Sequence, residues 1–292
     1  MLSRLSLADF LLLALNGVSF GTVLFLLASG LSLTLGLMRI LNMAHGALYM
    51  VGAYVGWSLV VHYGLNFWLA SLTAGIVSGV IGLAIERGFL RKLHHELNDQ
   101  ILLTLGFVYI LTNACQWIWG PMARPPFTSP MLSGSVQIAG WDYPRARVAI
   151  IAVGVVLAIG LWWLQDKTRM GAVVRAGIDD EEMAEGMGVR IERVYAVVFF
   201  LGAFVAGASG VIGAQLLGVN LDLSFDILLL AIVVVIIGGM GSVQGALVGG
   251  ILIGLIDSLG TVLFPDFAMF MIYLAMIIVL LIRPSGLLGR PI

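Results

Sequence analysis

Charged positions divide the chain into long stretches that contain no Asp, Glu, Lys or Arg. These stretches occupy residues 10–38, 40–85, 100–123, 148–165, 194–221, 227–256 and 267–282. A helix needs about 20 apolar residues to cross a bilayer. Helices are the expected elements, because backbone groups in lipid must be satisfied within their own segment. The pattern therefore predicts an all-α polytopic membrane protein.

Two of the stretches need to be divided. Stretch 40–85 is long enough for two spans, and the polar, glycine-containing sequence at 62–66 is the expected division. Stretch 227–256 is too short for two full spans and is interrupted by glycines at 238–242, which predicts a broken helix or two short ones. We therefore expect eight or nine membrane segments with interrupted helices. The side of the N-terminus depends on that count and stays open.

Basic residues are unevenly distributed among the connecting loops. Loops 86–99 and 166–193 together hold eight Lys and Arg residues, whereas loop 120–147 holds three. Cytoplasmic loops of membrane proteins carry an excess of basic residues. We therefore expect loops 86–99 and 166–193 and the C-terminus to be cytoplasmic, and loop 120–147 to be periplasmic.

The composition agrees with a membrane protein and excludes other classes. Hydrophobic residues make up 60% of the chain and charged residues 11%, against about 25% charged residues in an ordinary soluble domain. This balance excludes a soluble enzyme, a nucleic-acid-binding protein and a disordered chain. The single cysteine, Cys115, excludes an intramolecular disulfide and a cysteine-based zinc cluster. We expect residues 1–292 to form one transmembrane domain in the lipid bilayer.

Polar residues accompany two glycine-containing breaks in the apolar stretches. Asn42, His45 and Gly46 lie at the first break, and the second contains Gly238, Gly239, Gly241, Ser242, Gln244 and Gly245. The sequences 45–48 and 244–247 are similar and lie 199 residues apart, which predicts a two-half internal pseudo-repeat. Paired interrupted segments mark translocation sites in transporters. Polar groups also satisfy backbone freed by a break, and both interpretations fit these residues.

Motifs for catalysis are missing or weak. Neither lysine belongs to a phosphate-binding G-x-x-x-x-G-K-[ST] sequence, and H-E-x-x-H is absent. The string Gly207-Ala208-Ser209-Gly210 is similar to the nucleophile region of rhomboid-type proteases. All four histidines precede Ser209, however, whereas that family places its histidine later in the chain. We expect no catalytic, metal or cofactor site in this chain.

Loop 166–193 contains a pattern typical of a short helix. Acidic residues fill the first turn of segment 179–188, where they stabilise free backbone N–H groups. Met183 and Met187 are four residues apart and share a face, and Gly188 is a natural terminator. Such a helix is either a solvated connector or a peg that docks in a groove of a cytosolic partner. A transporter-like chain without its own ATP site favours the peg.

Three motifs resemble the permease subunits of branched-chain amino acid ABC importers, the LivH type. They are Asn42-Met43-Ala44-His45-Gly46, the segment Met183–Gly188, and the segment Gly238–Ala246; the ending Arg283–Gly289 is also similar. The likeness covers nearly the whole chain. Met43, Gly186 and Gln244 depart from the residues usual in that family. Gly186 weakens the short helix by about 1 kcal/mol relative to Ala.

The resemblance implies a permease subunit of the bacterial inner membrane. It implies a second related permease, a periplasmic binding protein, and two cytosolic ATP-binding subunits that carry the ATP and Mg²⁺ of the system. The residues that would contact an ATPase are Asp180, Met183, Ala184, Met187 and Gly188. The implied substrate is a branched-chain amino acid or a related small polar solute. An ion-coupled secondary transporter is the alternative, but it needs a charged site near the midplane, and Asp226 and Asp257 fall toward segment ends.

Overall fold

The computed structural model describes residues 7–38, 41–93, 96–138 and 140–289. Within these ranges, eight helices are long and apolar enough to cross a membrane. The helices that account for these spans are α1 (Leu7–Met38), α2 (Ala44–Trp57, extended by a π-helical turn to His62), α3 (Phe67–Gly88), α4 (Leu97–Trp119), α5 (Arg145–Lys167), α8 (Ile191–Leu217), α10 (Val243–Leu263) and α11 (Ala268–Ile282, which the preceding 3-10 turn Pro265–Phe267 extends to a span of 18 residues). A further apolar helix, α9 (Leu223–Gly238), has only 16 residues. The expected all-α membrane architecture is confirmed.

The two long stretches divide at the expected places. Between α2 and α3, Gly64 takes a positive φ and the Asn66 side chain accepts a hydrogen bond from the Trp68 N–H at 2.9 Å, which starts α3. Between α9 and α10, Gly239 and Gly241 both have positive φ. We expected a broken helix or two short ones here; the break is present and α9 is short, but α10 is a full-length helix, because it continues past Asp257 to Leu263.

Small residues bring the central helices into direct contact. Helix α1 packs on α10, and α8 packs on α2 and α3. A Cβ atom on Gly52 of α2 would lie 2.1 Å from the Gly207 carbonyl oxygen of α8, and one on Gly254 of α10 would lie 2.2 Å from that of Gly17 in α1. Without a hydrophobic driving force between helices in lipid, such close backbone contacts hold a bundle together.

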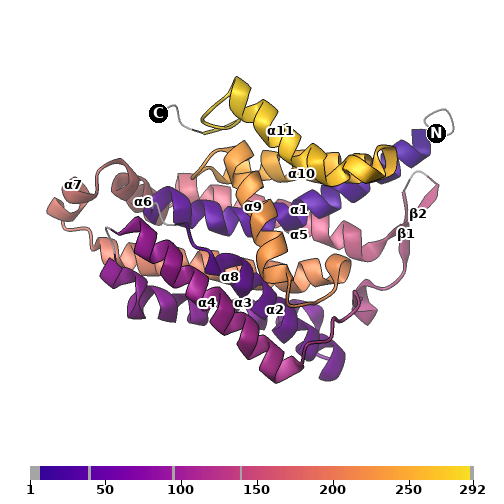
Figure 1. Ribbon diagram of the computed structural model, residues 1–292, viewed down its shortest axis with the longest axis horizontal. Helices are drawn as coiled ribbons and strands as arrows, with labels where there is room; N and C mark the ends of the chain where they lie inside the picture. The colour runs from indigo at the N-terminus through magenta and orange to yellow at the C-terminus, as the bar shows by residue number, and fades with distance from the viewer. Residues whose placement is uncertain (1–6, 39–40, 94–95, 139, 290–292) are drawn as a thin grey trace.

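The connecting segments gather at two opposite ends of the bundle (Figure 1). One end carries a hairpin of β1 (Ser135–Ile138) and β2 (Trp141–Pro144), paired with Ser135 opposite Pro144. The other end carries two short helices, α6 (Arg169–Asp179) and α7 (Glu181–Gly186). Helix α1 begins at the hairpin end, so the start of α1 and the hairpin lie at the same end of the bundle. Residues 290–292, for which we expected a cytoplasmic location, lie outside the described residues.

The two helices that follow the breaks begin at equivalent places. Helix α2 begins at Ala44 and α10 at Val243, 199 residues apart, as the similar sequences suggest. The helices then differ, since α2 ends in a π-helical turn and α10 is a regular helix of 21 residues. A pseudo-repeat that relates the two halves stays a prediction.

Candidate functional site

The break between α9 and α10 is built from backbone contacts. The Ser242 hydroxyl accepts a hydrogen bond from the Gly245 N–H at 2.9 Å and so caps α10. Gly238 and Gly245 face each other so closely that a Cβ atom on Gly245 would lie 2.2 Å from the Gly238 carbonyl oxygen. The glycines predicted to mark a translocation site therefore serve first to let α9 and α10 touch.

Segment 283–289 closes the end of α9. The Leu287 N–H donates to the Ile237 carbonyl at 2.8 Å, and the Leu288 N–H donates to the Gly238 carbonyl at 3.0 Å. The last carbonyl groups of a helix have no partner within the helix. A Cβ atom on Gly286 would lie 2.6 Å from the Gly239 nitrogen, so this capping contact needs glycine on both sides. The ending that resembles the family thus has a structural role.

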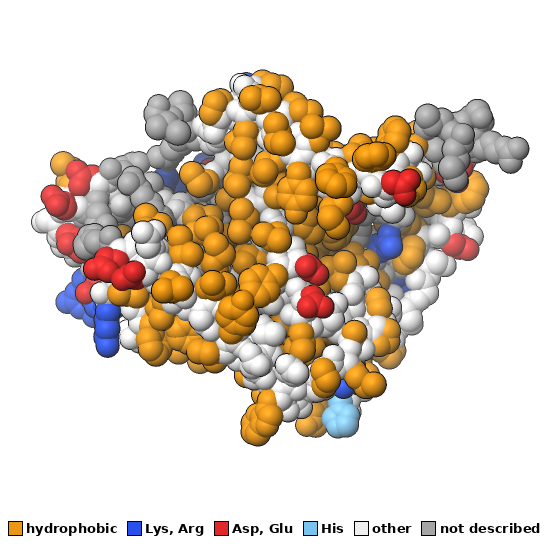
Figure 2. Space-filling view, in the orientation of Figure 1, with side chains coloured by type: hydrophobic (Ala, Val, Ile, Leu, Met, Phe, Trp, Pro, Cys, Tyr) orange, Lys and Arg blue, Asp and Glu red, His pale blue; other side chains and the backbone are white. Residues whose placement is uncertain are grey.

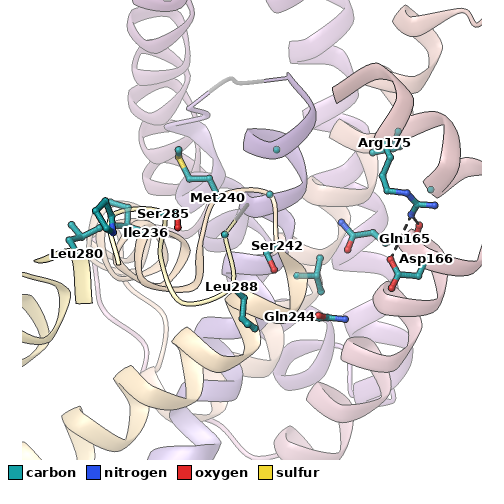
Figure 3. Close-up of a pocket in the computed structure, with 17 residues that line it drawn as sticks. Gln165, Asp166, Arg175, Ile236, Met240, Ser242, Gln244, Leu280, Ser285 and Leu288 are labelled. Atoms are coloured by element: carbon teal, nitrogen blue, oxygen red, sulfur yellow. Dashed lines mark hydrogen bonds and ion pairs between the residues drawn. The ribbon is translucent and has the colours of Figure 1, made fainter. Parts of the chain in front are cut away.

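A cavity of about 470 Å³ lies beside this break (Figure 3). Ser242 and Gln244 line it from the start of α10, together with Gly241 and Met240 of the break. Gln165, Asp166 and Arg175 line it from the junction of α5 and α6, and Ser285 lines it from the capping segment. Apolar side chains such as those of Ile236, Val243 and Leu280 complete the walls, and the contribution of α6 places the cavity toward the α6–α7 end of the bundle.

The α5–α6 junction supplies the charges of the cavity. Arg175 donates a hydrogen bond to the Gln165 carbonyl oxygen, and its Nη1 lies 3.7 Å from Oδ1 of Asp166. The Thr168 hydroxyl starts α6 by accepting from the Gly171 N–H at 3.1 Å. The sequence placed Asp166 and Arg175 only in a cytoplasmic loop. Their approach to Ser242 and Gln244 depends on tertiary packing and leaves no local signal.

The first break, between α1 and α2, does not open into this cavity. The His45 ring is fully buried, and its Nε2 lies 3.1 Å from the Leu27 carbonyl oxygen of α1. Asn42 is also buried, and its amide atoms have no hydrogen-bond partner among the described residues. A Cβ atom on Gly46 would lie 2.1 Å from the Ser224 carbonyl oxygen of α9. The structure therefore places these three residues inside the bundle, against α1 and α9.

The short helix predicted within residues 179–188 is present as α7. The Asp180 carboxylate caps it by accepting from the Met183 N–H at 2.9 Å, and Gly188 ends the segment with a positive φ. Ala184 is buried against the rest of the chain, whereas the side chains of Met183 and Met187 are 65% and 81% exposed. Two large apolar side chains thus project from the end of the molecule, held by a buried alanine between them.

Ser209 is placed as a packing residue. It is buried in α8, and its hydroxyl donates to the Ala206 carbonyl of the same helix at 2.8 Å. A serine nucleophile needs a neighbouring base that takes its proton. This hydrogen bond within the helix agrees with the small-residue explanation of the G-x-S-G string.

Comparison with known proteins identifies the family. The model of the branched-chain amino acid transport system permease component matches residues 13–280. The chain is 29% identical to the high-affinity branched-chain amino acid transport system permease protein LivH of Salmonella typhimurium, over 94% of both chains. It is 29% identical to BraD of Pseudomonas aeruginosa over the same shares, and 28% identical to LivM of Salmonella typhimurium over 90% of this chain and 67% of LivM.

A solved structure shares the fold. The likeness to a chain of PsaBC from Streptococcus pneumoniae, solved in complex with a Fab, has a TM-score of 0.53 at 14% identity and covers 94% of this chain and 91% of that one. The eight apolar helices are those expected of a membrane permease, and the family match over residues 13–280 includes nearly all of them. The chain belongs to the permease component family of branched-chain amino acid transport systems.

Proposed function

We propose that this chain and a second, related permease together form the route of a bacterial inner-membrane importer for branched-chain amino acids. The observation that carries the proposal is the match to LivH over 94% of both chains. The match to LivM supports a related permease as the partner, because LivM is also named as a permease of such a system. Two cytosolic ATP-binding subunits and a periplasmic binding protein complete the proposed assembly.

The proposal assigns separate roles to the two ends of the molecule. The α6–α7 end faces the cytoplasm, and Met183 and Met187 dock into a groove of an ATP-binding subunit. Their exposure supports this role, since solvent-exposed methionines at one site suit an adaptable contact. The β1–β2 end faces the periplasm and receives the binding protein. The basic residues of loops 86–99 and 166–193 support this orientation.

The helix breaks also have a proposed role. Gly241, Ser242 and Gln244 of the α9–α10 break border the cytoplasmic mouth of the route, where the cavity lies, and Gly238, Gly239 and Gly245 shape that break. Asn42, His45 and Gly46 act less directly, by holding the start of α2 against α1 and α9. A movement of α7 would reach the cavity through α6, because α6 supplies Arg175 to its wall.

Uptake into proteoliposomes tests the proposal. The chain is co-produced with its partner subunits, the purified complex is reconstituted with ATP inside, and radiolabelled leucine is added outside with the binding protein. We expect uptake that requires ATP and is unaffected by a proton or sodium gradient. Uptake driven by an ion gradient without ATP would support the secondary-transporter alternative instead. Uptake of radiolabelled urea or of a radiolabelled aromatic acid, with no uptake of leucine, would reassign the substrate.

A further inference from the structure

The cavity beside the α9–α10 break has a polar side and an apolar side. Figure 3 shows Gln165, Asp166 and Arg175 together at one side and Ile236 and Leu280 at the other. Its volume of about 470 Å³ falls within the range of about 300–1,000 Å³ that small-molecule sites occupy. Such sites combine apolar walls with a few polar groups that fix the orientation of the ligand. The cavity therefore suits a small molecule that is polar at one end and apolar at the other.

The polar side of the cavity carries charges of both signs. Asp166 and Arg175 are the only formally charged side chains among the described residues that line it. Arg175 Nη1 lies 3.7 Å from Asp166 Oδ1, which is longer than the hydrogen bonds of about 2.7–3.2 Å that nitrogen donors make. The Arg175 and Asp166 side chains are 36% and 47% exposed, so neither charge is closed off from a ligand. An anion alone would meet the Asp166 carboxylate and a cation alone the Arg175 guanidinium, whereas a zwitterion satisfies both.

A tight turn between α5 and α6 holds these charges in place. The Thr168 hydroxyl donates to a carbonyl of α5 at 2.5 Å and accepts from the Gly171 N–H at 3.1 Å. A Cβ atom on Gly171 would lie 2.0 Å from the Gln165 carbonyl oxygen, so the turn requires glycine there. Arg175 donates a hydrogen bond to the same carbonyl. Groups that are fixed before a ligand arrives lose less conformational freedom when it binds.

Aliphatic side chains cover the other side of the cavity. They come from α6, α9, α10, α11 and segment 283–289, and they are Val174, Ile236, Val243, Leu280 and Leu288. Ser242 and Gln244 lie between the aliphatic and the charged side in the view of Figure 3. Removal of apolar surface from water favours binding. A hydrocarbon branch attached to the zwitterion would therefore strengthen its binding here.

The surroundings of the cavity suit a ligand that arrives through water. Figure 2 shows acidic and basic side chains gathered at the α7 end of the molecule, and hydrophobic ones over much of its middle. Helix α6, which leads into α7, forms part of the cavity wall. The cavity thus lies toward the charged end of the molecule.

We infer that this cavity binds a free aliphatic amino acid from the cytoplasm, and that the bound amino acid slows import. Its carboxylate pairs with the Arg175 guanidinium, a planar donor that matches a carboxylate. Its ammonium group pairs with Asp166, and its side chain packs on the aliphatic wall. Ser242 and Gln244 offer further hydrogen bonds. This inference rests on the proposed transport function and adds regulation by the imported product.

Helix α6 links the cavity to the segment that would dock on an ATP-binding subunit. It supplies Val174 and Arg175 to the wall and ends at Asp179, and the next residue, Asp180, caps α7. A ligand that bridges α6 to α10 and to segment 283–289 opposes movement of α7 relative to the bundle. It stabilises the arrangement in which the cavity is formed, to the extent of its preference for that arrangement.

Protection of a cysteine in the cavity tests the ligand. In a Cys115→Ala background, Ser285→Cys places a thiol of similar size in the wall. The assembled importer is reconstituted in phosphatidylglycerol nanodiscs without ATP or binding protein, and a maleimide is added. Leucine should slow the reaction about tenfold at ten times its dissociation constant, because only unoccupied sites react. Ser133→Cys, which is exposed near the hairpin, is the control and should react equally with and without leucine.

Analogues of leucine separate the three contacts without any change to the protein. Isocaproate lacks the ammonium group, isoamylamine lacks the carboxylate, and glycine lacks the aliphatic side chain. Each should need a concentration about tenfold higher for equal protection, the loss expected when a charge-assisted or apolar contact is removed. Protection by isocaproate at the same concentration as leucine would overturn the zwitterion assignment.

A zwitterionic lipid headgroup offers the same pair of charges as an amino acid. Phosphatidylglycerol has no ammonium group, so a second set of nanodiscs contains phosphatidylethanolamine. We expect Ser285→Cys to react equally fast in the two lipids before leucine is added. Slow reaction in phosphatidylethanolamine alone would assign the cavity to a lipid headgroup and overturn the inference.

Internal leucine tests the regulatory role. Proteoliposomes that contain ATP are preloaded with unlabelled leucine, and the initial uptake of radiolabelled leucine is compared with uptake by the same variant into vesicles without leucine. The rate should fall about tenfold at ten times the dissociation constant, because only unoccupied transporters continue to cycle. Arg175→Gln, which removes the cationic partner, and Leu288→Trp, which fills the cavity, should abolish this inhibition. The exposed hairpin variant Asp142→Asn is the control and should be inhibited like the unmodified protein.

Failure of the inference can be distinguished from failure of the proposed function. ATP-driven uptake that internal leucine does not slow would reject the regulatory role while the transport function stands. Inhibition that persists in both cavity variants would reject this cavity as its site. A complex that takes up no leucine, but whose Ser285→Cys is still protected by leucine, would reject the proposed function while the binding site stands.

Discussion

Individual glycines at the two breaks make close backbone contacts that the sequence does not show. The sequence associated Gly46 and Gly245 with a translocation site, and in the structure both face the backbone of a neighbouring helix at separations that exclude a Cβ atom. A sequence shows that a close approach is allowed at glycine, and it does not show what approaches. The position of His45 could not be predicted from the sequence either, because its contact with Leu27 joins two helices across a break.

Substitution of these glycines should therefore affect folding before transport. Gly46→Ala would place a methyl group 2.1 Å from the Ser224 carbonyl oxygen, and overpacking of this kind costs about 1–3 kcal/mol. We expect a lower melting temperature for the purified variant in detergent, measured by intrinsic fluorescence. Gly160→Ala, where nothing lies within 4 Å of the added atom, is the control and should stabilise α5 by about 0.5–1 kcal/mol. An unchanged melting temperature for Gly46→Ala would refute the packing role.

Among the elements, α7 could be predicted from local signals alone. The cap at Asp180, the paired methionines and the terminator Gly188 all act within one or two turns. The predicted α10 was shorter than the observed one, because Asp257 marked the end of an uncharged stretch and the helix continues past it.

The exposed methionines of α7 lead to a prediction about energy coupling. Full burial of a methionine side chain contributes roughly 1.5–3 kcal/mol, and an aspartate in its place would bring an unpaired charge into the contact. We expect Met183→Asp/Met187→Asp to abolish leucine uptake and the substrate-stimulated part of ATP hydrolysis. Basal ATP hydrolysis and membrane insertion should persist, because both methionines are exposed in this chain.

A neighbouring charge provides the matched control for this experiment. Glu182 is exposed in the same helix, and a first-turn charge contributes only about 0.3–1 kcal/mol to helix stability. Glu182→Gln should therefore transport almost normally. Wild-type uptake by the double aspartate variant would show that α7 is only a connector.

At the scale of the whole molecule, the fold class and a count of eight or nine membrane segments followed from the distribution of charges and glycines, and eight spans are found in the described residues. The uncharged stretches predicted the positions of the membrane helices. The glycine-containing interruptions predicted the divisions between α2 and α3 and between α9 and α10. The sequence did not predict which helices pack against each other, because contacts such as those of α1 with α10 join segments that are far apart in the chain. The cavity beside Ser242 has the same origin, since α5, α6, α10 and segment 283–289 meet only in three dimensions.

The orientation of the molecule gives a prediction that needs no transport activity. Ser135 in the hairpin and Glu185 in α7 are both exposed and lie at opposite ends of the bundle. In a Cys115→Ala background, a membrane-impermeant thiol reagent added to intact cells should label Ser135→Cys and leave Glu185→Cys unlabelled, because loops rich in basic residues are generally retained in the cytoplasm. After the cells are opened, both should react. Labelling of Glu185→Cys alone in intact cells would invert the orientation.

The capping contact between segment 283–289 and α9 has a consequence for biosynthesis. Helix α9 leaves the ribosome well before Leu287 and Leu288, whose N–H groups complete its last turn. Until then the carbonyl groups of Ile237 and Gly238 lack these partners, and an unpaired buried polar group costs about 1–3 kcal/mol. The α9–α10 break can therefore take its final shape only late in synthesis, after α11 has been made. In a nascent chain inserted in the membrane, the C-terminal end of α9 would stay uncapped until segment 283–289 has been synthesised.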